Sequence, residues 1–369
     1  AQEISVLQDL YISTNGNEWI WRDASYGIPW NFTANCNPCV ENWQGVTCKL
    51  DPNSSSQHII MLSLNNYNLH GTLPTSLMNI TKLEQLIMSN NNLYGTIPAS
   101  FGKLYNLEYL SLYENPKLTG SIPIQLGDLS TLVELDLGYC SITGTIPVSL
   151  SQLYNLEQLW LDYNAELTGT IPPELGNLSM LTHLHLGYCS ITGTIPATLG
   201  QLNRLKHIWL DYNAELTGTI PDQLGDLSML YDLKLEYCSL TGTIPASLGQ
   251  LTYLEHLWLF GNAELTGTIP PELGNLSMLI ELDLYDCSIT GTIPASLGQL
   301  NNLIDLGLDG NAELTGTIPP DLGNLSLLTD LYLRDCSLTG TIPASMYHLS
   351  HLIYVALNNN LLTGSIPSN

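Results

Sequence analysis

The chain of 369 residues contains 34 Asp and Glu against 9 Lys and Arg, which gives a formal net charge of −25. This charge excludes nucleic acid and anionic membrane surfaces as partners, because both are negatively charged and would repel the chain. No apolar run is long enough to cross a bilayer, so we expect no membrane insertion. The chain starts AQEISVLQDL, with neither Met nor a basic leader, and we interpret it as a mature secreted chain whose export signal has been removed.

Residues 1–58 form an N-terminal segment that shares no repeat with the rest of the chain. Ile4, Leu7, Leu10 and Tyr11 have helical spacing, which predicts a helix that packs one face on the first repeat. The stretch CNPCVENWQGVTC follows at residues 36–48. Four tryptophans are expected to fill the core of this segment rather than to form a ligand platform: Trp19, Trp21, Trp30 and Trp43.

From Ile59 onward the chain repeats the unit LxxLxLxx(N/C)xLTGxIPxxLGxLxx thirteen times, at spacings of 24 and 25 residues that alternate after the first copies. The extra residue of the longer copy lies in NAEL, at residues 164–167 in one case. The LxL alternation places two leucines inside a short strand and the residue between them outside. A single unit cannot bury its own leucines, so neighbouring units must stack into one continuous core.

This unit resembles the leucine-rich repeat family, specifically its plant-type subclass with the LTGxIP segment. Residues 36–48 resemble the cysteine-containing N-terminal cap of plant and protist members. The resemblance implies an α/β-type solenoid, a right-handed superhelix with a parallel concave β-sheet. In this interpretation residues 1–58 are the cap and residues 59–369 are the solenoid, without a recognisable C-terminal cap.

The cap resemblance further implies a disulfide between Cys39 and Cys48, which leaves Cys36 over. Three alternatives stay open for Cys36: a free thiol, the partner of Cys48 in place of Cys39, or a bridge to another chain.

The ninth position of the unit is Asn in some copies and Cys in alternate ones. Cysteines of alternate copies are about 10 Å apart at strand spacing, beyond the ~7 Å Cα separation that a disulfide spans. We therefore predict that they are reduced, buried and structural. They are Cys140, Cys189, Cys238, Cys287 and Cys336.

Six Asn-x-Ser/Thr sequons agree with an extracellular, secreted or cell-surface location and are candidate glycosylation sites. Four of them share one place in the repeat, so they are not independent evidence. The six are Asn31, Asn53, Asn79, Asn177, Asn275 and Asn324.

The second, third, fifth, seventh and eighth positions of each copy are predicted to line the concave face. These positions differ between copies while the rest barely changes, which indicates a face that meets something different along its length. Exposed Trp and Tyr rows are typical of binding surfaces, although a ladder that stiffens the sheet is as good an explanation for the tyrosines. The predicted ligand-binding residues are Trp160, Asp162, Tyr163, His185, Tyr188, His207, Trp209, Asp211, Tyr212, Lys234, Tyr237 and Trp258.

Acidic residues fill much of the remaining concave face, most densely toward the C-terminus. Carboxylates beside aromatic rings suit a carbohydrate, and they suit a cationic peptide or protein equally well. His183 and His207 lie near enough to share Zn²⁺ with Asp232, but a flat sheet rarely converges three ligands, so we predict a pH-responsive patch and no metal. No cofactor is expected. The sequence contains no nucleophile–base triad, phosphate loop or kinase signature, which predicts a non-enzyme.

Three functions follow from these observations. The leading hypothesis is a secreted recognition module that binds glycan or peptide on its concave face. The second is a structural glycoprotein that self-associates through its solenoid ends into filaments or matrix, suggested by the missing cap and by Cys36. The third is ice binding by the repeated TGT array, which runs from Thr143 and Thr145 to Thr339 and Thr341.

Overall fold

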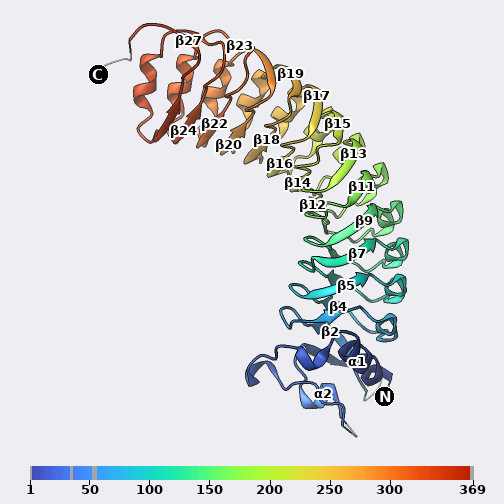
Figure 1. Cartoon of the computed structure of the whole chain (residues 1–369). Coiled ribbons are helices and arrows are strands. Elements are labelled where there is room, and N and C mark those ends of the chain that lie inside the picture. The colour runs from blue at the N-terminus through green and yellow to red at the C-terminus, as the bar shows by residue number, and fades with distance from the viewer. Residues whose placement is uncertain (1, 34–35, 52–55, 366–369) are drawn as a thin grey trace. The chain divides into compact units, whose positions relative to one another are not determined.

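A computed structural model describes residues 2–33, 36–51 and 56–365 (Figure 1). The chain divides into two compact units, residues 1–181 (unit 1) and residues 182–369 (unit 2). Each unit is a stack of repeats, and in each repeat one short strand, a second strand and a helical turn follow one another. Within the described ranges, no helix has the length and apolar character needed to span a bilayer.

The N-terminal segment of unit 1 packs around its tryptophans. The predicted helix is confirmed as α1 (Gln2–Ser13), which buries Leu7 and Leu10. Trp30 stacks on Trp43 with ring centroids 5.8 Å apart, and both side chains are buried. A disulfide joins Cys39, in α2 (Pro38–Glu41), to Cys48, the pair that the cap resemblance implies. Cys36 is free, and two short 3-10 turns complete the segment, η1 (Gly16–Glu18) and η2 (Ala24–Tyr26).

The LxL stretches form the first sheet of each unit. All its strands pair in parallel and in register, except that the first two of unit 1 pair antiparallel. The strands of unit 1 are β1 (Val46–Leu50), β2 (Gln57–Ser63), β4 (Gln85–Ile87), β6 (Tyr109–Ser111), β8 (Glu134–Asp136) and β10 (Gln158–Trp160). Those of unit 2 are β12 (His183–His185), β14 (His207–Trp209), β16 (Asp232–Lys234), β18 (His256–Trp258), β20 (Glu281–Asp283), β22 (Asp305–Gly307), β24 (Asp330–Tyr332) and β26 (Tyr354–Ala356).

The LTGT stretches form a second set of parallel strands. In unit 1 these are β3 (His70–Gly71), β5 (Asn92–Thr96), β7 (Lys117–Ser121), β9 (Ser141–Thr145) and β11 (Leu167–Thr170). In unit 2 they are β13 (Ser190–Thr194), β15 (Leu216–Thr219), β17 (Ser239–Thr243), β19 (Glu264–Thr268), β21 (Ser288–Thr292), β23 (Leu314–Thr315), β25 (Thr339–Gly340) and β27 (Leu361–Leu362).

Each repeat returns through a 3-10 turn of five residues that begins directly after a proline. Proline fixes its own φ and has no N–H, so it starts the turn. The turns stack so closely that a Cβ added to Gly225 would lie 2.5 Å from the carbonyl oxygen of Ser247 in the next repeat. They are η3 (Thr75–Asn79), η4 (Ala99–Lys103), η5 (Ile124–Asp128), η6 (Val148–Gln152), η7 (Pro173–Asn177), η8 (Ala197–Gln201), η9 (Asp222–Asp226), η10 (Ala246–Gln250), η11 (Pro271–Asn275), η12 (Ala295–Gln299), η13 (Pro320–Asn324) and η14 (Ala344–His348).

The core of each unit consists of the leucines and isoleucines of the repeat, nearly all without exposed surface. The parallel-sheet solenoid expected from the sequence is therefore confirmed. The five cysteines of the ninth position are buried and reduced, as predicted.

Candidate functional site

The residues that point outward from the first sheet form the surface that the sequence predicts to be concave, here called the first-sheet face. In unit 2 the fifth position supplies His185, Trp209, Lys234 and Trp258 on successive strands. In-register pairing places them side by side: His185 opposite Trp209, Trp209 opposite Lys234, and Lys234 opposite Trp258.

These four side chains bind one another. The ring of His185 stacks on Trp209 with centroids 3.8 Å apart. Lys234 Nζ lies 4.1 Å from the ring centroid of Trp209 and 4.1 Å from that of Trp258, which is a cation–π contact on each side. Both faces of the Trp209 indole are therefore covered, although the residue is only half-buried and lies outside the leucine core.

Trp258 also bonds to the next strand through the edge of its ring. Trp258 Nε1 donates a hydrogen bond to Glu281 Oε2 at 2.9 Å. In unit 1, Trp160 is half-buried and pairs in register with Asp136. Asp162 is also half-buried, and the exposed Tyr163 stacks on Tyr139 with centroids 3.8 Å apart.

The third position of unit 2 brings histidines to a shared carboxylate. His207 Nδ1 and His256 Nδ1 both bond to Asp232, the latter at 2.6 Å. Burial alone would raise the pKa of Asp232, but the bonds from the two histidines outweigh it and hold that pKa well below its usual range. The bond to Asp232 also raises the pKa of His256, against the effect of burial.

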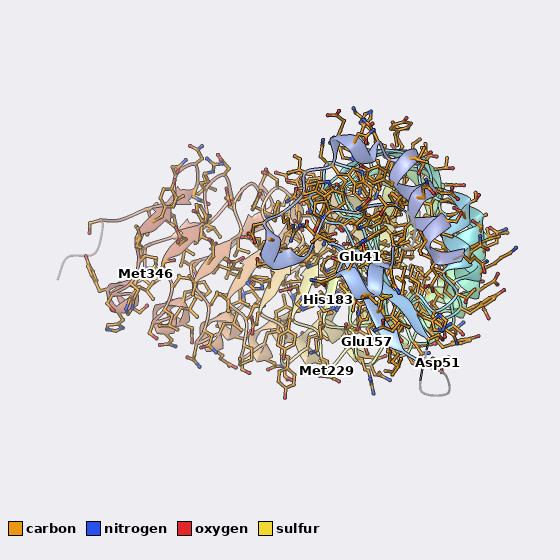
Figure 2. The ribbon with its side chains drawn as sticks, turned by 90° about the horizontal axis from the view of Figure 1, so that it is seen from below. Glu41, Asp51, Glu157, His183, Met229 and Met346 are labelled. Carbon is orange, nitrogen blue, oxygen red and sulfur yellow. A yellow bond between two sulfur atoms is a disulfide. The ribbon has the colours of Figure 1, made fainter. Side chains whose placement is uncertain are left out.

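Two further histidines are neutral at ordinary pH. Burial and the neighbouring His207 lower the pKa of His183, labelled in Figure 2, to about 4. Burial and His183 lower the pKa of His185 to about 3. The rings of His183 and His207 stack with centroids 4.5 Å apart. Across the described residues, no group of three or more His, Cys, Asp and Glu is arranged to hold a metal ion.

The eighth position of unit 2 forms a row of tyrosine rings. Tyr188 and Tyr212 stack with centroids 4.2 Å apart, and Tyr212 and Tyr237 lie 4.6 Å apart with planes tilted by 39°. Their edges stay accessible: Tyr212 is 39% exposed and Tyr237 is 40% exposed. The tyrosines thus form the ladder that the sequence left as one alternative, and they still present an outer surface.

Two predicted ligand-binding residues do not line an open trough. His185 is buried beside Trp209, and Asp211 is only 6% exposed. Asp211 fits there because its neighbour Gly187 has no side chain; a Cβ on Gly187 would lie 2.5 Å from Asp211 Oδ1. On the next repeat Glu236 is 4% exposed, and its Oε2 has no hydrogen-bond partner among the described residues. Burial, with the adjacent Asp211, raises the pKa of Glu236 to about 8.

Toward its C-terminal end, the first-sheet face of unit 2 is hollowed. This acidic hollow has a volume of about 410 Å³. Gly307 has no side chain at the fifth position there, between Asp283 and Tyr332, and the Asp283 carboxylate extends over it, since a Cβ on Gly307 would clash with Asp283 Oδ1. The hollow is lined by Asp283, Tyr285, Asp286, Asp305, Asp309, Tyr332, Arg334 and Tyr354.

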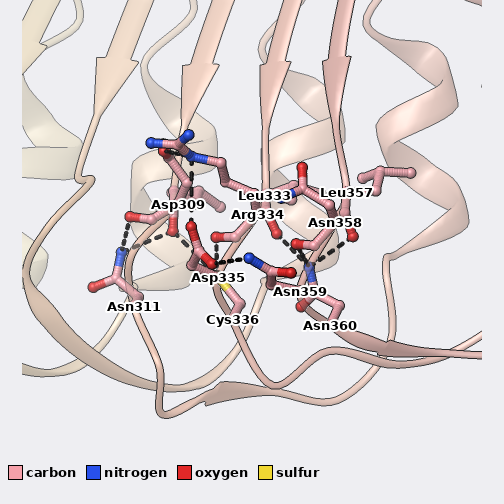
Figure 3. Close-up of polar contacts among 11 residues, drawn as sticks. Asp309, Asn311, Leu333, Arg334, Asp335, Cys336, Leu357, Asn358, Asn359 and Asn360 are labelled. Atoms are coloured by element: carbon pink, nitrogen blue, oxygen red, sulfur yellow. Dashed lines mark hydrogen bonds and ion pairs between the residues drawn. The ribbon is translucent and has the colours of Figure 1, made fainter.

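The carboxyls of the acidic hollow are incompletely neutralised. Arg334 Nε donates a hydrogen bond of 3.0 Å to Asp309 Oδ2 and compensates that carboxylate. Figure 3 shows these two side chains in contact. Asp305 Oδ1 is buried and has no hydrogen-bond partner within the part of the chain that the structure describes. Burial and the neighbouring acids raise the pKa of Asp283 to about 7 and that of Asp305 to about 6.

Sequence reasoning noted the acids of this region but did not assign them, or the three tyrosines, to the site. The sequence feature that could have pointed to this site is the pair Gly307 and Gly310, because these glycines leave the fifth and eighth positions of one repeat without side chains.

A second hollow, of about 340 Å³, lies in unit 1 beside the N-terminal segment. Lys49, Lys82 and Glu84 line it together, and Lys49 Nζ is 3.3 Å from Glu84 Oε1. Because basic and acidic side chains line this hollow together, it favours neither a cationic nor an anionic ligand.

The sequons lie mainly on the helical turns. Asn177, Asn275 and Asn324 are exposed at the ends of η7, η11 and η13, where a glycan has room. Asn79 is half-buried at the end of η3 and Asn31 is exposed. Asn53 lies outside the described residues. Glycosylation at these positions remains a prediction.

The chain is similar to known repeat proteins in sequence and in structure. The family described as Leucine rich repeat matches residues 81–142, 155–178, 180–202, 278–300 and 327–349. A search of curated protein sequences found no match.

Among solved structures, the plant peptide hormone receptor RGFR1 in complex with RGF2 is 37% identical with a TM-score of 0.83, over 88% of this chain and 54% of that one. This chain therefore spans about half the length of the receptor structure. A plant ice-binding protein is 26% identical with a TM-score of 0.62, over 79% of this chain and 88% of that one.

A leucine-rich repeat protein of Leptospira interrogans is 31% identical with a TM-score of 0.64, over 82% of this chain and 79% of that one. Its likeness covers most of both chains, and the matched repeats extend through both units. The protein therefore belongs to the leucine-rich repeat family.

Proposed function

We propose that the chain is a non-catalytic extracellular recognition module whose first-sheet face binds a cationic peptide or protein segment. The acidic hollow of unit 2 is the observation that carries this proposal. Its carboxyls Asp283 and Asp305 have no basic partner in the hollow, because Arg334 is bonded to Asp309. A lysine or arginine side chain would supply the missing charge, and the tyrosine rings would pack on its aliphatic stem.

A carbohydrate fits this face less well than a peptide does. Sugar rings bind by stacking on a free indole face, and His185 and Lys234 cover both faces of Trp209. One face of Trp258 is also covered by Lys234. The charge of the hollow supports a cationic ligand instead.

The structural neighbours support a peptide ligand, though their names do not specify its charge. The neighbour RGFR1 is a plant peptide hormone receptor. No neighbour supports the hypothesis of end-to-end filaments.

Binding to matched peptide libraries tests this function. Two libraries of equal length, one containing Lys and Arg and the other with Gln in their place, are titrated against the protein. We expect binding from the cationic library only, weakened about tenfold or more by Asp283→Asn combined with Asp305→Asn. The control pair Asp222→Asn and Glu272→Gln removes the same charge from exposed turns and is expected to bind normally. Equal binding of both libraries, or equal loss in both pairs, contradicts the proposal.

Ice binding is a second candidate, favoured by the threonines of the second set of strands. The second Thr of each TGT is exposed along unit 2, and it pairs in register with the first Thr of the next repeat where Thr194 meets Thr217 and Thr243 meets Thr266. The likeness to a plant ice-binding protein supports it. Thermal hysteresis of the purified protein, abolished by Thr219→Tyr with Thr268→Tyr, is the expected result; no hysteresis in the parent protein rejects this candidate.

A further inference from the structure

The eighth position of every repeat adopts a backbone conformation that suits few residues. Its φ is positive throughout, and most repeats place Asn, Asp or Gly there, as at Asn90, Asp286 and Gly310. Those residues tolerate the left-handed region, whereas a bulky side chain is strained in it. Five repeats nevertheless carry tyrosine, with φ of 51° at Tyr139, 56° at Tyr163, 53° at Tyr188, 53° at Tyr212 and 50° at Tyr237.

Five consecutive repeats keep tyrosine in this strained backbone conformation, so we infer that the phenol rings themselves have a function. Stacking is one gain from these rings, but it needs no hydroxyl.

The hydroxyls of stacked tyrosines lie on the same side of the pair. The hydroxyl of Tyr139 donates a hydrogen bond to that of Tyr163, and this bond, ahead of burial, raises the pKa of Tyr139 to about 12. In unit 2 the hydroxyl of Tyr188 bonds in the same way to Tyr212. With ring planes only 17° and 15° apart, the ortho carbons beside these hydroxyls face one another.

We propose that this tyrosine ladder is an oxidative modification site, at which a peroxidase using hydrogen peroxide joins consecutive repeats through dityrosine. The ladder comprises Tyr139 and Tyr163 in unit 1, and Tyr188, Tyr212 and Tyr237 in unit 2. The modification is independent of the peptide ligand proposed above.

The chemistry balances with hydrogen peroxide as the oxidant. Each of two phenols gives up one electron and its hydroxyl proton to become a phenoxyl radical. The two radicals couple through their ortho carbons, forming one C–C bond. Each ortho proton then leaves its carbon while a proton returns to the phenol oxygen, which restores both aromatic rings. The pair has lost two hydrogen atoms in all, and the peroxide has taken them up to give two molecules of water.

Proximity and exposure together select these tyrosines. The pair Tyr139 and Tyr163 are each 37% exposed, so an oxidant reaches their edges while the partner ring is already in contact. Coupling within a preformed pair outruns any encounter between separate molecules. Tyr105 is more exposed, but it has no ring contact among the described residues.

The experiment treats the dilute purified protein with a haem peroxidase and limiting hydrogen peroxide. We expect dityrosine fluorescence in the monomeric fraction, a yield per molecule that does not change on tenfold dilution, and a mass loss of two hydrogen atoms per link. Peptide mapping is expected to join the segment containing Tyr139 to the one containing Tyr163, and that containing Tyr212 to a neighbour on the ladder.

Phenylalanine variants keep the rings and remove the phenols. Tyr163→Phe is expected to abolish the link to Tyr139 and leave unit 2 unchanged, and Tyr212→Phe is expected to abolish the links of the ladder in unit 2, those to Tyr188 and Tyr237. Tyr105→Phe, the matched control at an exposed tyrosine, is expected to leave the yield unchanged. The inference is overturned if dityrosine occurs only in covalent dimers, or if its intramolecular yield survives both ladder variants. Peptide binding by the acidic hollow is measured separately and does not bear on this result.

Discussion

The backbone N–H of Ile191 donates a hydrogen bond to the side-chain Oδ1 of Asn213, one repeat further on, at 3.0 Å. The amide Nδ2 of Asn213 in turn donates to the carbonyls of Leu186 and Leu210, at 2.9 and 2.8 Å. One buried asparagine thus satisfies three backbone groups that the turn between strands leaves without partners.

The following repeat solves the same problem differently. There the equivalent N–H belongs to Leu216, and the extra residue of the longer repeat lets it donate to the carbonyl of Asn213 at 2.9 Å. No acceptor is needed from the next repeat, and Cys238 supplies only a weak donor, from Sγ to the carbonyl of Leu210 at 3.4 Å. Repeat length and the choice of Asn or Cys therefore alternate together for one physical reason.

Removing the asparagine should cost more than removing the cysteine. Asn213→Ala leaves a buried N–H and two carbonyls without their partner, so we expect the free energy of unfolding to fall by about 2–4 kcal/mol. Cys238→Ala loses a weak donor and a small buried volume, with an expected loss of about 1 kcal/mol. Urea unfolding followed by circular dichroism measures both. Equal losses would show that the amide contacts are not what the longer side chain provides.

Thiol reactivity should separate the two kinds of free cysteine. Burial raises the pKa of Cys140 and Cys238 to about 12, so neither forms the reactive thiolate in the folded protein. Cys36 is partly exposed. We expect one thiol to react with an aromatic disulfide reagent under native conditions and the rest only in denaturant. Cys36→Ser is the control and should abolish the native reaction; rapid labelling of the other cysteines would contradict their burial.

The sequence predicted the positions that depend on the strand period alone. The leucines of LxL are buried and Trp209 lies outside them, because alternation on a strand settles which side faces the core. The contacts that outward side chains make with side chains on adjacent strands could not be predicted from the sequence. The insertion of Lys234 between two indoles depends on its rotamer, and the burial of Asp211 depends on the absence of a side chain at Gly187.

The acidic hollow was missed for a similar reason. A list of outward acids shows the charge, but it does not show that these side chains enclose a hollow across several repeats.

Replacing the buried Glu236 with a neutral residue should stabilise the folded protein at high pH only. The pKa of Glu236 is about 8 in the folded protein and 4.5 for the free side chain, so folding favours the protonated form. Ionised Glu236 therefore lowers the free energy of unfolding. This cost is absent below pH ~4.5, grows as the pH rises, and is complete above pH ~8. Glu236→Gln is therefore expected to unfold at higher denaturant concentration above pH 8, by on the order of a few kcal/mol, and to match the parent near pH 4. Glu264→Gln, at an exposed position, is the control and should show no such trend.

Binding of a cationic peptide should strengthen as the pH rises through the range in which the hollow ionises. Asp305 and Asp283 have pKa values of about 6 and about 7, so both are largely protonated at pH 5 and largely ionised at pH 8. A bound lysine or arginine interacts only with the ionised forms, and we expect about tenfold or greater tightening between these two pH values. Isothermal titration calorimetry measures the affinity and the protons released on binding. His256, whose pKa is raised by its bond to Asp232, also loses positive charge as the pH rises and would act in the same direction. Asp283→Asn with Asp305→Asn separates the two sources: a flat pH profile assigns the effect to the hollow, whereas an unchanged profile assigns it to the histidines and removes the hollow from the binding site.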